Sequence, residues 1–129
     1  MAPKKVLIVD DDEGFVASNR DMLEVLGYEV GTASNGAEAL EQAMALKPDL
    51  MILDVMMTYD TEGFDVARKM RSIPELAGMK ILLVSGIVSA KNLPKAAQPD
   101  EQWLPVERVL EKPIDPPKLI GEIEKLIGN

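Results

Sequence analysis

The feature that most constrains the fold is the short segment Leu50–Asp54, in which the apolar run LMIL leads directly into a lone carboxylate. Pro48 precedes the run, and a polar turn that ends at Gly63 follows it. An apolar run of this length between turn signals is typical of a strand that is buried on both faces. The carboxyl end of such a strand is where open α/β sheets bind ligands. Taken alone, however, Asp54 is equally well explained as a cap for the next helix.

Apolar runs of strand length alternate with segments of helical periodicity along the rest of the chain. The predicted strands are Val6–Val9, Glu29–Ser34, Leu50–Asp54, Lys80–Ser85 and Val109–Glu111. The predicted helices are Phe15–Leu26, Ala37–Leu46, Gly63–Ile73 and Pro117–Ile127. This alternation predicts one α/β domain, residues 1–129, with a parallel sheet that is covered by helices on both faces.

Two of the predicted helices indicate which side chains face the core. In the second helix, the spacing predicts an inner face made of Leu40, Ala43 and Met44. In the last helix, the apolar residues predicted to face inward are Leu119, Ile120, Ile123, Leu126 and Ile127. The charged residues predicted to face outward there are Lys118, Glu122, Glu124 and Lys125.

Composition excludes several classes of function. The 129 residues contain no cysteine and no histidine, which removes disulfides, thiolate metal sites and a histidine phosphorelay within this chain. A net charge of −8 without a basic run argues against direct binding of nucleic acid. Because no apolar run approaches the roughly 20 residues that span a bilayer, and no signal-peptide pattern is present, we expect no membrane insertion and a cytoplasmic location. Any bound metal is expected to be a hard cation held through oxygen.

Polar residues that could act together stand at the carboxyl ends of the predicted strands. The first strand is followed by Asp10 and Asp11, the third ends in Asp54, the fourth ends in Ser85, and Lys112 follows the fifth. Because neighbouring parallel strands end at one edge of the sheet, we expect these side chains to form one pocket. Crowded carboxylates repel each other unless a cation lies among them, and Mg²⁺ prefers oxygen ligands. Asp54 is then the candidate nucleophile toward a phosphoryl group, with Ser85 and Lys112 as its partners.

The same residues resemble the signature of the receiver domains of two-component response regulators, and the resemblance covers essentially the whole chain. The matching residues are Asp10-Asp11 after VLIV, Asp54 after DLMIL, Ser85 after ILLV, and Lys112-Pro113. The resemblance implies a flavodoxin-like (βα)5 fold, a doubly wound parallel sheet with strand order 2-1-3-4-5. It also implies a signalling domain rather than an enzyme, with phosphoryl transfer to Asp54 from a sensor histidine kinase or a phosphotransfer protein.

The resemblance further implies a role for each site residue. The ligands that it implies for Mg²⁺ are Asp11, Asp54, the backbone carbonyl of Met56 and, through water, Asp10. Ser85 is expected to bind a phosphoryl oxygen, and Lys112 is expected to pair with the phosphoryl group. The peptide bond between Lys112 and Pro113 is expected to be cis, a state that proline tolerates.

The chain departs from the family pattern at several positions. Thr58 stands where the family commonly has proline, and Gly63 lies nine residues past Asp54 rather than eight, so the loop is one residue longer. Val109 replaces the family's switch aromatic, three residues before the lysine. The fourth helix of the family falls in Gly86–Arg108, which has weak periodicity and contains several prolines. Since a proline inside a helix costs roughly 3 kcal/mol, we expect this helix to be shortened or irregular.

Signal output is expected to depend on a second protein, whose identity the sequence does not indicate. No DNA-binding or catalytic domain follows within the 129 residues, so phosphorylation would be read by a downstream protein or by self-association. The expected reading surface is Gly86–Arg108 together with the fifth strand and the final helix. Trp103, the single tryptophan, is either a core residue of this segment or a partly exposed anchor for the partner.

Two other functions are compatible with parts of this pattern. A haloacid-dehalogenase-type phosphatase would use Asp10 as nucleophile, together with Asp12, Ser85 and Lys112. Against it, the residues after Asp12 do not match that class, the chain is short for a substrate cap, and Asp54 would have no role. A pseudo-receiver would bind partners without accepting phosphate, although every acid-site residue is present.

We expect a phosphoryl group on Asp54 to be long-lived. Met56 and Ile87 occupy two positions that flank the phosphoryl group in the family, and both are apolar here, so they should exclude the attacking water. Replacing Met56 with Asn and Ile87 with Glu should therefore speed dephosphorylation in a phosphate-release assay. Unchanged or slower release from the double variant would contradict this prediction.

Overall fold

The structure of the protein is a computed structural model that describes residues 3–54, 62–85, 106–112 and 114–128. Its strands are β1 (Lys5–Val9), β2 (Glu29–Ala33), β3 (Leu50–Asp54), β4 (Lys80–Ser85) and β5 (Arg108–Glu111). Its helices are α1 (Glu13–Val25), α2 (Gly36–Leu46), α3 (Glu62–Arg71) and α4 (Pro116–Ile127), with a 3₁₀ turn at Pro74–Leu76. The predicted strands and helices are present, with bounds that agree to within two residues. Within these ranges, no helix is both long enough and apolar enough to cross a membrane.

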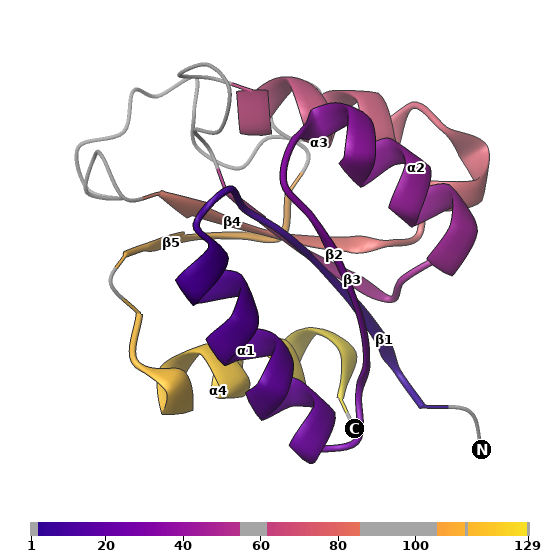
Figure 1. Ribbon diagram of the computed structural model, residues 1–129. Coiled ribbons are helices and arrows are strands. Elements are labelled where there is room, and N and C mark those ends of the chain that lie inside the picture. Colours follow the sequence, from indigo (N-terminus) through magenta and orange to yellow (C-terminus); the bar gives the residue numbers. More distant parts are fainter. Residues whose placement is uncertain (1–2, 55–61, 86–105, 113, 129) are drawn as a thin grey trace.

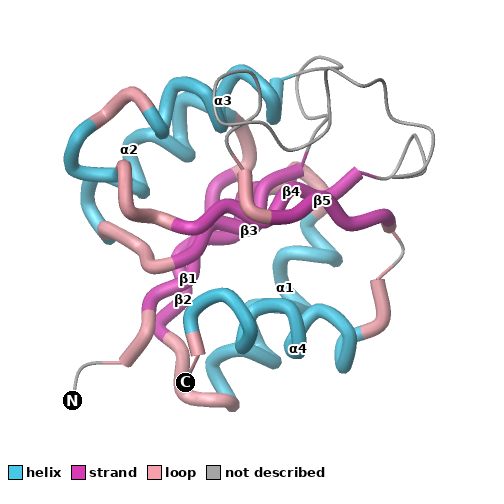
Figure 2. The backbone as a smooth tube through the Cα atoms, turned by 180° about the vertical axis from the view of Figure 1, so that it is seen from behind, coloured by secondary structure: helices cyan, strands magenta, loops and turns pink. Residues whose placement is uncertain are grey.

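The strands pair in parallel in the order β2-β1-β3-β4-β5, which confirms the flavodoxin-like order implied by the resemblance. Figure 1 shows α1 and α4 on one face of the sheet and α2 and α3 on the other. Figure 2 shows the same two helical layers from behind. Since the chain winds one way from β1 to β2 and the other way from β3 onward, the carboxyl ends of β1 and β3 flank the crevice where such sheets bind ligands.

Side-chain alternation along the central strand β3 separates two hydrophobic cores. Met51 and Leu53 pack with side chains of α2 and α3, whereas Leu50 and Ile52 pack with side chains of α1 and α4. All four of these side chains are at most 1% exposed. Because both faces of β3 are buried, the strand is a continuous apolar run. Burial of each such side chain stabilises the fold by roughly 1.5–3 kcal/mol.

Side-chain caps determine where α1 and α2 begin. The Asp12 carboxylate accepts a hydrogen bond from the Phe15 backbone N–H at 3.2 Å, and the Asn35 side chain accepts one from the Glu38 N–H at 2.9 Å. Each cap satisfies a backbone N–H group that the helix end leaves without an internal partner. α1 therefore begins earlier than the predicted Phe15. It ends before Gly27, whose φ of 97° favours glycine.

Two side chains lie differently from the predicted helix faces. Glu122, predicted to face outward on α4, is only 6% exposed, and its carboxylate lies 3.3 Å from the guanidinium of Arg108 on β5. The Arg108 cation makes the burial of the Glu122 carboxylate possible. Helical spacing within α4 carries no information about a partner on β5. Met44, predicted to face inward on α2, is 40% exposed. Ala43 is buried as predicted and Leu40 packs half-buried against the core. Ala39, rather than Met44, completes the buried face of α2, so this face is rotated slightly from the predicted one.

Several predictions lie outside the described residues. They are the Met56 carbonyl, the loop that contains Thr58, the flanking position Ile87, the form of the fourth helix, Trp103, and the cis bond to Pro113. The strands on either side of the long segment 86–105 are described, and they lie next to each other. In their ladder, Ser85 at the end of β4 is paired with Glu111 at the end of β5.

The buried Glu122 carboxylate should make Arg108 important for stability. Replacing Arg108 with Met leaves this carboxylate without its cation, and we expect the free energy of unfolding to fall by about 1–3 kcal/mol. Urea denaturation at neutral pH measures the change. A double variant that also replaces Glu122 with Leu should recover most of the loss, because an apolar pair has no charge to desolvate.

Arg20 provides a matched control, because it forms exposed ion pairs with Asp21 and Glu24 on α1. Replacing Arg20 with Met should change the free energy of unfolding by less than about 0.5 kcal/mol. Equal losses for the Arg108 and Arg20 variants would contradict the assignment of a buried, charge-paired Glu122.

Candidate functional site

The carboxyl edge of the sheet gathers the predicted site residues from separate strands. Asp10 follows β1 directly, Asp54 is the last residue of β3, and Lys112 follows β5. Ser85 ends β4, where the ladder pairs it with Glu111, the residue just before Lys112. Because these strands are parallel and adjacent, their ends meet at one edge, although 102 positions separate Asp10 from Lys112 in the chain.

Three carboxylates form the centre of the site. One oxygen each from Asp10, Asp11 and Asp54 lies within 4.8 Å of the other two. Asp10 and Asp54 are 3% and 7% exposed, whereas Asp11 is exposed to solvent. Buried carboxylates are costly unless their charge is balanced, and carboxylate oxygens are the ligands that hard divalent cations prefer. The donor set therefore fits Mg²⁺, and the exposed Asp11 keeps the cluster accessible from solvent.

Lys112 provides a cation against this cluster. Its Nζ donates a hydrogen bond to Asp10 Oδ2 at 2.5 Å and lies 4.0 Å from Asp54 Oδ1. The same ammonium lies 4.3 Å from the centroid of the Phe15 ring. One ammonium against three carboxylates leaves a formal excess of two negative charges. A divalent cation would balance that excess.

The start of α1 divides the acidic run that follows β1 into two parts. Asp10 and Asp11 belong to the carboxylate cluster, while Asp12 caps α1 and Glu13 lies in its first turn. The Asp12 N–H donates to Asp10 Oδ1 at 2.9 Å, which orients the Asp10 side chain from the backbone. The partial positive charge of a helix N-terminus also favours carboxylates in this position. The negative charge of these four acidic residues is thus offset by the N-terminus of α1 as well as by Lys112.

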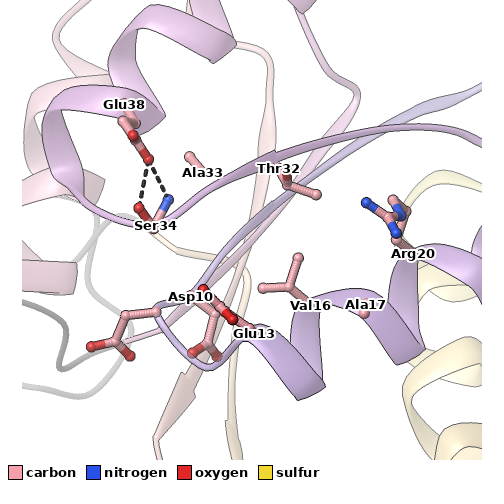
Figure 3. Close-up of a pocket in the computed structure, with 10 residues that line it drawn as sticks. Asp10, Glu13, Val16, Ala17, Arg20, Thr32, Ala33, Ser34 and Glu38 are labelled. Atoms are coloured by element: carbon pink, nitrogen blue, oxygen red, sulfur yellow. Dashed lines mark hydrogen bonds between the residues drawn. The ribbon is translucent and has the colours of Figure 1, made fainter.

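A cleft of about 350 Å³ opens beside the cluster, between α1 and the turn that joins β2 to α2 (Figure 3). Its lining residues are Asp10, Asp11, Glu13, Val16, Ala17, Arg20, Thr32, Ala33, Ser34 and Glu38. The Glu38 carboxylate accepts hydrogen bonds from the Ser34 hydroxyl and N–H at 2.6 and 2.9 Å. These bonds, the hydroxyl first, lower the pKa of Glu38 below its ordinary value. Glu38 is therefore engaged with its own turn rather than with the carboxylate cluster.

The structure brings Asp10, Asp11, Asp54 and Lys112 into one cluster, while their chemical roles stay predictions. Ser85 reaches the same edge through the position of its backbone at the end of β4. Sequence reasoning missed Phe15 as a neighbour of Lys112. The N-cap at Asp12 could have indicated this neighbour. Phe15 is the third residue after the cap, so it lies in the first turn of α1, next to the carboxyl edge of the sheet.

Comparisons with known proteins agree with this geometry. The chain matches the response regulator receiver domain over residues 6–124. It is 29% identical over 127 residues to the polar-differentiation response regulator DivK of Brucella anthropi, and this alignment covers 98% of each of the two chains. The chemotaxis protein CheY4 of Vibrio cholerae superposes with a TM-score of 0.83 and 30% identity, covering 97% of this chain and 99% of that one. A CheY-like receiver domain protein from Methanospirillum hungatei superposes with a TM-score of 0.80 and 28% identity, covering 95% and 92%.

The family match spans most of the chain, from the first strand to the last helix. The strand order and the acidic cluster at the carboxyl edge are consistent with that match. The chain therefore belongs to the response regulator receiver domain family, the signalling domains of two-component systems.

Proposed function

We propose that this protein is a phosphorylation-controlled signalling domain, residues 1–129, in which Asp54 accepts the phosphoryl group. The observation that carries the proposal is the environment of Asp54 at the end of β3. One oxygen each from Asp54, Asp10 and Asp11 lies within 4.8 Å of the other two, and Asp54 Oδ1 lies 4.0 Å from Lys112 Nζ. A carboxylate beside both a cation and a candidate metal cluster is suited to act as an oxygen nucleophile toward phosphorus.

The proposed transfer is an in-line displacement. A carboxylate oxygen of Asp54 forms a bond to phosphorus while the P–N bond of a phosphohistidine donor breaks. The imidazole leaves with the bonding electron pair, and Asp54 carries an acyl phosphate. Because phosphoryl transfer depends mainly on positioning and electrostatic stabilisation, Asp54 needs no separate general base.

The metal and the remaining site residues have electrostatic roles in this proposal. The oxygen ligands proposed for Mg²⁺ are those of Asp11, Asp54, the Met56 backbone and, through water, Asp10. A bound Mg²⁺ would neutralise charge on the carboxylates and on the phosphoryl oxygens. Lys112 pairs with the phosphoryl group, and the Ser85 hydroxyl donates a hydrogen bond to one of its oxygens.

The phosphohistidine donor lies outside these 129 residues, and a downstream protein is the proposed receiver of the signal. This chain has no histidine, so the phosphohistidine belongs to a sensor histidine kinase or a phosphotransfer protein. Phosphorylation adds about −1.5 to −2 charges at the carboxyl edge, which changes the surface offered to a downstream protein. The net charge of −8 supports a protein rather than nucleic acid as that partner.

The phosphatase alternative has weaker support from the geometry. The second aspartate that it requires, Asp12, is exposed and caps α1 through the Phe15 N–H. Asp54, which that mechanism would leave without a role, lies within the carboxylate cluster. The pseudo-receiver alternative differs from the proposal in one respect, which is whether Asp54 accepts a phosphoryl group at all.

Incubation with acetyl phosphate and Mg²⁺ tests the proposal directly. Intact mass should show the addition of one phosphoryl group to the wild-type protein. The addition should be lost in Asp54→Asn, which removes the nucleophile, and in excess EDTA, which removes the metal. Asp12→Asn is the matched control, and it should be phosphorylated as the wild type is.

The outcomes separate the three candidate functions. An equal adduct in Asp54→Asn, or in excess EDTA, would refute metal-dependent phosphorylation of Asp54. No adduct on the wild-type protein would favour the pseudo-receiver. Steady phosphate release from p-nitrophenyl phosphate that survives Asp54→Asn but not Asp10→Asn would favour the phosphatase.

A further inference from the structure

The aromatic ring beside Lys112 has no role in the chemistry proposed above. The centroid of the Phe15 ring lies 4.3 Å from Lys112 Nζ, within the roughly 6 Å over which an aromatic face attracts an ammonium. The same ammonium lies 2.5 Å from Asp10 Oδ2 and 4.0 Å from Asp54 Oδ1. We propose that Phe15 is a positioning residue, which holds the Lys112 ammonium within reach of the group that Asp54 carries. This inference rests on the function proposed for Asp54 and Lys112.

An aromatic face suits this task because it attracts a cation without neutralising it. The cluster already has a formal excess of two negative charges, so another carboxylate beside Lys112 would increase the repulsion within it. A phenyl ring carries no formal charge. The ammonium therefore keeps its charge available for Asp54 and for a phosphoryl group on that residue.

The ring is held in place independently of Lys112. The Phe15 N–H donates to the Asp12 cap at 3.2 Å, so the backbone of Phe15 is fixed at the start of α1. The Phe15 side chain is half-buried and packs against the core that lies between the sheet and helices α1 and α4. Because the helix start and the core determine the position of the ring, the ring can act as a fixed support for a longer, more flexible side chain.

Lys112 borders open space that would otherwise allow it to move. A groove of about 620 Å³ lies between α1 and the start of α4, and its lining includes Phe15, Met22, Lys112 and Ile114. A lysine side chain has many rotamers, and free space beside it leaves most of them accessible. Contact with the ring favours the rotamers that keep the ammonium beside Asp10.

Variants at Phe15 separate the aromatic face from simple packing. Phe15→Leu keeps an apolar side chain against the core but removes the ring, whereas Phe15→Tyr keeps the ring. With acetyl phosphate and Mg²⁺, we expect Phe15→Leu to lower the maximal rate of Asp54 phosphorylation by about threefold to tenfold, from the usual strength of a partly desolvated cation–π contact. Phe15→Tyr should stay within about twofold of the wild type. Met22→Leu, a change on the same helix in the same groove, is the matched control.

A double-mutant cycle shows whether Phe15 acts through Lys112. In a Lys112→Met background, adding Phe15→Leu should cause no further loss of rate, because the ammonium that the ring positions is already absent. Urea unfolding of each variant shows whether it is folded under the assay conditions. If Phe15→Leu slows phosphorylation equally in both backgrounds, its effect is one of packing and the proposal is overturned.

A second measurement does not depend on phosphorylation. Protons that lie over an aromatic face are shifted upfield, so the ε-methylene resonance of Lys112 should be shifted in the wild type and in Phe15→Tyr, and unshifted in Phe15→Leu. An unshifted resonance in the wild type would overturn the positioning role. If the wild type accepts no phosphoryl group, the function proposed for Asp54 fails, and this resonance still decides whether Phe15 holds Lys112.

Discussion

Repulsion between carboxylates at the edge of a buried sheet is the constraint on which the site depends. Asp10 and Asp54 are almost fully buried at the ends of two adjacent strands, where their charges cannot be screened by water. The Lys112 ammonium, 2.5 Å from Asp10 Oδ2 and 4.0 Å from Asp54 Oδ1, offsets part of that repulsion. The remaining formal excess of negative charge makes the same place favourable for a divalent cation. The repulsion among these carboxylates therefore links the fold to the proposed chemistry.

The short segment from Asp10 to Phe15 has several roles at the carboxyl edge of the sheet. Its first two residues belong to the carboxylate cluster, and its third residue caps α1. The last residue of the segment is bound by that cap through its N–H and places its ring beside Lys112. Because the helix begins immediately after the strand, each of these side chains has little freedom to move away from the edge.

β5 depends on contacts at both of its ends and on the last helix. It has four residues, and within the described part of the chain its strand partner is β4. Arg108 at its start pairs with the buried Glu122 of α4, and Lys112 just after its end pairs with Asp10. The end of α4 is in turn held by Tyr28, whose hydroxyl donates to the Gly128 carbonyl at 3.2 Å. Burial, together with the nearby Glu124 charge, raises the pKa of Tyr28, so this hydroxyl remains a donor well above neutral pH.

The sequence by itself determined which segments along the chain are strands and which are helices. Apolar runs and helical periodicity are local signals, and tertiary packing did not override them. It also located Asp10, Asp11, Asp54 and Lys112 at one edge, since parallel strands end together and residues at strand ends are read directly from the chain. The tertiary structure alone decided that Glu122 is buried against Arg108 and that the Phe15 ring lies beside Lys112. Each of those contacts joins side chains of two different elements: β5 with α4, and α1 with the residue that follows β5. Their partners depend on how helices are rotated and seated on the sheet, which no local period encodes.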